Sequence, residues 1–188
     1  FYKLLGNSPS LWVALSLILH GLNAYLVYRF TRKCIHFLIG KQINLSAIFS
    51  GIFFLISPYQ TEAIIWTPTN LPILISTLLS ITSLLILLQY LESGQKYLLY
   101  FFHTIFLLAV FSYESSFVLP GVALLLYVLY KATQKTELSL RQLMARIVLP
   151  QAGIIFLYFA ATKMLAGEWI WHGKEFGWSL SFSTLAGN

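Results

Sequence analysis

Two glutamates stand alone among apolar residues, each beside the end of an apolar stretch. Glu62 lies in segment 57–66, and Glu114 lies in the short polar segment 112–116. A carboxylate at a membrane boundary is unfavourable unless it is paired or used, so both glutamates are candidates for a functional site. Each also precedes another apolar stretch, and the alternative is that it stabilises the N-terminus of the helix that follows.

The histidines show no metal-binding spacing. His20 and Asn23 lie on one face of the first apolar stretch, and His103 lies within a later one. Polar side chains in such positions usually form hydrogen bonds between helices. Because Cys34 is the only cysteine, neither an internal disulfide nor a zinc site is expected. The sequence also has no phosphate-binding glycine loop and no nucleophile elbow.

The composition indicates a membrane protein. Hydrophobic residues make up 58% of the chain and charged residues 10%, whereas about a quarter of a soluble domain is charged. So little charge cannot cover a surface that faces water, and apolar side chains must therefore face lipid. The formal net charge is +6, but the basic residues lie beside apolar stretches rather than in a patch of their own. That placement excludes nucleic acid as the partner.

Six apolar stretches predict an all-α polytopic bundle of about six transmembrane helices in a single domain. We expect these spans at residues 11–30, 45–57, 71–91, 97–111, 117–130 and 147–165, with segment 112–116 as a turn. The second span is short enough for a re-entrant helix, but the placement of charge requires it to cross. In the third span, Ser76, Ser80 and Ser83 share a face where another helix can approach closely.

Basic residues predict the orientation of the spans. Nine of the 12 Lys and Arg residues fall in loops on one side, and these loops are therefore assigned to the cytoplasm. Four of the glutamates, Glu62 and Glu114 included, fall on the opposite side, where any carboxylate chemistry is expected. The aromatic segment 168–178 is expected to lie on the bilayer surface, with a sugar or lipid site as the alternative. The expected location is a bacterial plasma membrane.

The order of these features resembles the GT-C superfamily of membrane glycosyltransferases over residues 2–130. Residues 23–28 read Asn-Ala-Tyr-Leu-Val-Tyr, similar to the Asn-Ala-x-Leu-Val-Tyr of that group. Pro58, Glu62, Ala63 and Trp66 are spaced like its Pro-x-x-x-Glu-Ala-x-x-Trp loop. Residues 112–114, followed by Pro120, resemble its Ser-Lys-Glu turn. The resemblance is to enzymes that depend on dolichyl or undecaprenyl phosphate, including O-mannosyltransferases with tetratricopeptide repeats and their bacterial relatives.

The resemblance implies a GT-C-like fold and transfer of a sugar from a polyprenyl-phosphate donor to a protein, lipid or glycan. Glu62 and Glu114 are then the catalytic candidates, and Trp66, Tyr113 and Asn70 are the candidates for substrate binding. The partners would be the bilayer, the lipid-linked sugar and other membrane subunits. A divalent metal or a basic side chain can neutralise a leaving phosphate, and the cofactor is left open.

Three departures from the family pattern keep a second hypothesis open. The main acidic motif of the family falls in a loop upstream of Phe1, which we expect to be missing together with the first span. A second acidic position corresponds to Pro72, and the lysine of the Ser-Lys-Glu turn is Tyr113 here. The alternative is therefore a catalytically inactive GT-C-like scaffold subunit of a larger membrane complex. A transporter is disfavoured because the polar breaks lie at the membrane boundary rather than near its midplane.

Overall fold

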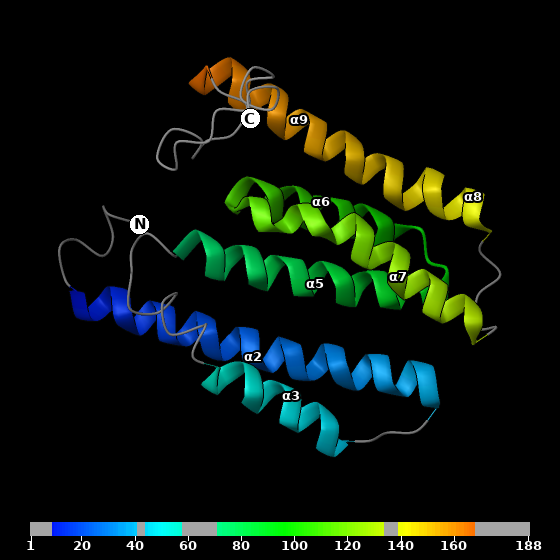
Figure 1. Cartoon of the computed structure of the whole chain (residues 1–188), viewed down its shortest axis with the longest axis horizontal. Helices are drawn as coiled ribbons and strands as arrows, with labels where there is room; N and C mark the ends of the chain where they lie inside the picture. The colour runs from blue at the N-terminus through cyan, green and yellow to red at the C-terminus, as the bar shows by residue number, and fades with distance from the viewer. Residues whose placement is uncertain (1–8, 41–43, 58–70, 134–138, 168–188) are drawn as a thin grey trace, which may run out of the picture.

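Long helices run alternately in opposite directions through the structure. The computed structural model describes residues 9–40, 44–57, 71–133 and 139–167, which are helical and contain no strand. Its longer helices are α2 (Pro9–Ile39), α3 (Asn44–Ile56), α5 (Leu71–Ser93), α6 (Tyr97–Ser112), α7 (Leu119–Ala132) and α9 (Leu149–Ala166). A 3₁₀ helix, η2 (Glu114–Val118), precedes α7, and α8 (Leu140–Leu143) with a π-helical turn, η3 (Met144–Val148), precedes α9. Helices α2, α5 and α7 run one way, and α3, α6 and α8–α9 run the other way (Figure 1).

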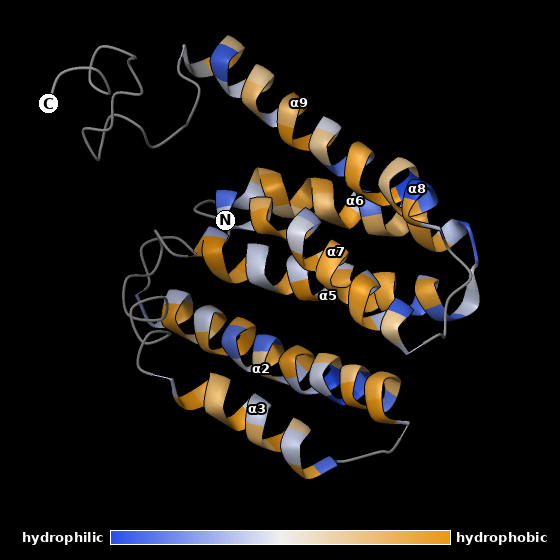
Figure 2. Cartoon of the chain, turned by 45° about the vertical axis from the view of Figure 1, so that its right-hand side comes forward, coloured by the Kyte–Doolittle hydropathy of each residue, from blue (hydrophilic) through white to orange (hydrophobic). Residues whose placement is uncertain are grey.

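Four helices are long and apolar enough to cross a membrane. They are Pro9–Ile39, Leu71–Ser93, Glu114–Ala132 and Leu140–Leu165. Asn44–Ile56 and Tyr97–Ser112 are apolar but shorter. Hydrophobic residues dominate all of these helices (Figure 2). The predicted class, an all-helical multi-pass membrane protein, is thus confirmed in outline, while the count of six crossings and the GT-C fold stay predictions.

Two helices extend well beyond the predicted spans into neighbouring basic segments. The sequence predicts an end of the first span at residue 30, but α2 continues to Ile39. It ends at Gly40, whose φ of 74° suits a left-handed cap and whose N–H donates to His36 O at 2.9 Å. The last span is predicted from residue 147, but helix begins at Leu140 because Ser139 and Gln142 form a capping box.

The predicted turn at 112–116 is much shorter in the structure. Helix α6 continues through Ser112, and η2 begins at Glu114. Tyr113 alone is extended, with φ −164° and ψ 143°. The chain therefore reverses direction around one residue, and Glu114 stands at the very start of the returning helix.

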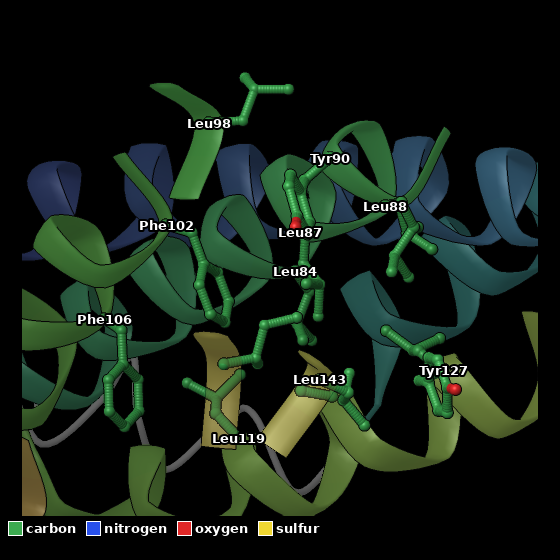
Figure 3. Packing of buried hydrophobic residues seen from close by; sticks show 14 of the residues in the cluster. Leu84, Leu87, Leu88, Tyr90, Leu98, Phe102, Phe106, Leu119, Tyr127 and Leu143 are labelled. Carbon is green, nitrogen blue, oxygen red and sulfur yellow. The ribbon is translucent and has the colours of Figure 1, made fainter. Parts of the chain in front are cut away.

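The buried centre lies among α5, α6 and α7. Leu87, Phe102 and Phe106 are completely buried there, and Tyr127 reaches the same cluster from α7 (Figure 3). Helix α2 packs against α5 on one side and α3 on the other. The rings of Phe37 and Tyr130 stack with centroids 3.6 Å apart, which joins α2 to α7. Since lipid is as apolar as these side chains, close packing rather than exclusion from water holds the bundle together.

Candidate functional site

One end of the bundle brings Glu114 to the same side as the helix ends that flank segment 58–70. Here α3 and α6 end, and α5 and η2 begin (Figure 1). We call it the Glu114 end. Glu62, Trp66 and Asn70 lie outside the described residues, in segment 58–70 between α3 and α5. The structure therefore places the two residues that flank this segment, Ser57 and Leu71, but does not test the three predicted site residues themselves.

The Glu114 carboxylate is held by the last helix. Tyr158 Oη of α9 donates a hydrogen bond of 2.6 Å to Glu114 Oε1. The rings of Phe111 and Phe117 pack edge-on against Tyr158 at centroid distances of 5.5 and 5.3 Å. Tyr158 is buried and Glu114 is partly exposed. One carboxylate oxygen is thus fixed between α9 and η2, and among the described residues no partner is shown for Oε2.

A cluster of serine hydroxyls fixes the backbone beside Glu114. Ser116 Oγ lies 2.7 Å from Ser76 Oγ and 3.0 Å from Ser80 Oγ of α5. Ser76 Oγ also donates to the carbonyl oxygens of Tyr113 and Ala109, both at 3.3 Å. The predicted serine face is confirmed, because these hydroxyls let α5 approach the end of α6 and the start of η2. Tyr113, a predicted substrate-binding residue, lies at this point, half-buried.

Helix α2 contacts both helix ends that flank segment 58–70. His20 Nε2 lies 3.0 Å from Leu55 O in the last turn of α3, and Asn23 Nδ2 donates to Leu74 O in the first turn of α5 at 3.0 Å. The carbonyls in the last turn of a helix lack partners within that helix, so His20 satisfies one of them. The prediction that His20 and Asn23 bond between helices is confirmed. Both side chains position the ends of the segment that carries Glu62.

A histidine of α6 bonds to the turn that precedes α9, the helix that carries Tyr158. In an α-helix the carbonyl of Arg146 would accept from the amide of residue 150, but Pro150 has no N–H. His103 Nε2 of α6 lies 2.9 Å from Arg146 O and must be the donor, because a carbonyl only accepts. The interhelical bond predicted for His103 is therefore present, and it satisfies a carbonyl to which Pro150 cannot donate.

We expect the contribution of His103 to the free energy of unfolding to depend on Pro150. His103→Leu should lower the free energy of unfolding by about 0.6 to 1.7 kcal/mol, which are the average and the largest value measured for such bonds in a membrane protein. In a Pro150→Ala background the Arg146 carbonyl regains a donor in its own helix, and the same substitution should have a smaller effect. Unfolding of the four proteins in mixed micelles measures this coupling. Equal effects of His103→Leu in both backgrounds would contradict the account.

The other end of the bundle collects positive charge. The described Lys and Arg residues there are Arg29, Arg32, Lys33, Lys96, Lys131, Arg141 and Arg146. We call it the basic end. Lys33 Nζ pairs with Glu92 Oε2 at 3.1 Å, which ties the end of α2 to the end of α5. The antiparallel arrangement thus places the predicted basic loops at one end and Glu114 at the other.

Comparison with known protein families, characterised proteins and solved structures finds no match to this chain. The described residues include no group of three metal-binding side chains, so the structure offers no metal site to test there. Among the described residues, Tyr158 is a site residue that the sequence did not predict. Gln151, Tyr158 and Thr162 recur at helical spacing on one face of an otherwise apolar span, and all three are buried. That spacing could have indicated a polar contact for α9 from the sequence.

Proposed function

We propose that the chain is the membrane domain of a glycosyltransferase that takes its sugar from a polyprenyl-phosphate donor at the non-cytoplasmic face. The observation that carries the proposal is the setting of Glu114. Its carboxylate is partly exposed at the end of the bundle opposite the basic residues, and Tyr158 fixes one of its oxygens at 2.6 Å. A carboxylate that is oriented but still reachable suits a general base.

The proposed reaction is a single displacement at the sugar. Glu114 takes the proton of the acceptor hydroxyl while the oxygen of that hydroxyl attacks the anomeric carbon. The bond from the anomeric carbon to the phosphate breaks at the same time. The phosphate leaves with the bonding electrons, so the configuration at the anomeric carbon inverts. Tyr158 orients the carboxylate through Oε1, which keeps Oε2 for the acceptor. Charge builds on the sugar ring in the transition state, as in glycoside hydrolysis.

The resemblance to GT-C enzymes supports the same proposal from the sequence. Glu62 is proposed as a second catalytic carboxylate, with Trp66, Asn70 and Tyr113 as contacts for the substrate. The helix ends on either side of segment 58–70 lie at the same end of the bundle as Glu114, which suits joint action (Figure 1). We further propose a GT-C-like arrangement of six crossings in a bacterial plasma membrane.

Orientation follows from the charge at the two ends. Lys and Arg favour the cytoplasmic side, so the basic end is proposed to face the cytoplasm. With Cys34 replaced by serine, Ser115→Cys at the Glu114 end should react with a membrane-impermeant maleimide in intact cells. Gln95→Cys at the basic end should react only after the membrane is opened. Both residues are exposed. The reverse labelling pattern would overturn the orientation.

The direct test is transfer of a radiolabelled hexose from a polyprenyl-phosphate carrier by the intact protein in membranes. The proposal expects label to appear in an acceptor from those membranes, and none with carrier from which the sugar has been removed.

The second candidate, an inactive scaffold subunit, is favoured by Tyr113 and Pro72, which replace polar residues of the family pattern. It expects no transfer, together with stable co-purification of other membrane proteins.

A further inference from the structure

One face of α2 carries three polar side chains that the helices around it satisfy only in part. Ser16, His20 and Asn23 lie four and three residues apart, which places them within one narrow stripe. Their exposed fractions are 0%, 2% and 0%. Ser16 Oγ, His20 Nδ1 and Asn23 Oδ1 are each buried without a hydrogen-bond partner. Gln151 and His103 Nδ1 are also buried and unpartnered, but they belong to different helices, whereas here three such groups adjoin on one helix.

The bonds that are formed determine the chemistry of the atoms left over. His20 Nε2 faces Leu55 O, and since a carbonyl only accepts, the nitrogen there carries the proton. In the neutral ring Nδ1 is then an acceptor. Stacking on Phe54, with centroids 5.3 Å apart, holds the ring in this orientation. Asn23 uses its amide nitrogen on Leu74 O, which leaves Oδ1 as a second acceptor. The Ser16 hydroxyl can accept or donate.

A group that fits this face must therefore supply hydrogen-bond donors and carry no charge. Phosphate and carboxylate groups lack enough donors for two acceptors. An ammonium group has donors, but a buried charge needs a partner of opposite sign. The carboxylates among the described residues are Glu92 and Glu114, and neither belongs to α2 or α3. Neutral hydroxyl groups, those of a sugar or of ordered water, remain as the matching chemistry.

We propose that the polar face of Ser16, His20 and Asn23 binds the hydroxyl groups of a lipid-carried sugar, which is the donor's sugar if the proposed function holds. The face lies at the Glu114 end, because α3 ends at Ile56 and α5 begins at Leu71 beside it. Ser16 lies about 6 Å from His20 toward the N-terminus of α2, beyond the bonds that His20 and Asn23 make to the neighbouring helices. A sugar that arrives from this end meets Ser16 before it meets the bonds that join α2 to α3 and α5.

Ser16→Ala isolates the proposed role, since this hydroxyl makes no bond that the fold needs. The intact protein in nanodiscs is titrated with polyprenyl-phosphate hexose, hexosyl-diacylglycerol and the sugar-free form of each lipid, and bound lipid is counted by native mass spectrometry. We expect preference for the sugar-bearing lipids, and about 3- to 10-fold weaker binding of these alone in Ser16→Ala. The matched control is Ser50→Ala, whose hydroxyl bonds within its own helix to Ser46 O at 3.0 Å.

The outcomes separate this inference from the proposed function. Sugar-dependent binding that is weakened in Ser16→Ala supports the face as a sugar site, even if the protein transfers no sugar. Binding that is the same with and without sugar overturns it. So does an equal response of Ser16→Ala and Ser50→Ala, which would leave ordered water as the occupant of the face. An unchanged melting temperature of Ser16→Ala is expected throughout, because no protein bond is lost.

Discussion

Replacement of Glu114 by glutamine should abolish most sugar transfer while leaving the fold intact. The amide oxygen of glutamine can still accept the hydrogen bond from Tyr158, so the contact between η2 and α9 persists. The side chain can no longer take a proton from the acceptor hydroxyl. General-base catalysis contributes about 10²- to 10⁴-fold, and the transfer rate of Glu114→Gln should fall by that factor. Initial rates with labelled polyprenyl-phosphate hexose measure it.

Two further variants distinguish catalysis from structure. Glu92→Gln makes the same chemical change at the basic end, where Glu92 pairs with Lys33, and transfer should continue at nearly the normal rate. Tyr158→Phe keeps the Glu114 carboxylate but removes its orienting hydroxyl, so its loss of rate should be smaller than that of Glu114→Gln. Equal rates for Glu114→Gln and Glu92→Gln would remove Glu114 from the mechanism. An unfolded Glu114→Gln protein would show that the carboxylate is structural.

Features that depend on periodicity along one helix were predicted well. The serines of α5 recur at three- and four-residue spacing, and the helix must present them together whatever packs against it. They indeed meet Ser116 and the carbonyls at the end of α6. The bonds of His20, Asn23 and His103 were predictable for a related reason, since a polar side chain inside an apolar helix has few partners other than another helix.

Features that depend on distant pairing or on charged helix ends were not predictable in the same way. Glu114 and Tyr158 are 44 residues apart, and only the packing of α9 beside η2 brings them together. The basic segments after residue 30 and before residue 147 were read as loops. The described parts of both segments are helical. After residue 30, Arg32 reaches back to Tyr28 Oη at 3.3 Å and Lys33 reaches Glu92 on α5. Before residue 147, the capping box at Ser139 starts the helix.

The close contact between α2 and α3 rests on one glycine, and Gly51→Leu should disrupt it. Helix α3 buries only Ala47 and Gly51, four residues apart, and both belong to the face against α2. A Cβ atom at Gly51 would lie 3.1 Å from Ala24 O and 3.1 Å from Tyr28 Cβ. A leucine side chain cannot fit there unless the two helices move apart. Overpacking of this kind costs about 1–3 kcal/mol.

Gly153→Leu on α9 is the matched control, because a Cβ there would meet nothing within 4 Å. Leucine favours helix over glycine by up to about 1 kcal/mol, so this variant should be neutral or slightly more stable. Unfolding in mixed micelles compares the two, with Gly51→Ala expected in between.

Separation of α3 from α2 would also pull Leu55 O away from His20 Nε2, now 3.0 Å apart. If the helix end before segment 58–70 is set by that bond, Gly51→Leu should reduce sugar transfer as well as stability, whereas Gly153→Leu should reduce neither. A loss of stability without any loss of transfer would show that the position of α3 does not govern the site.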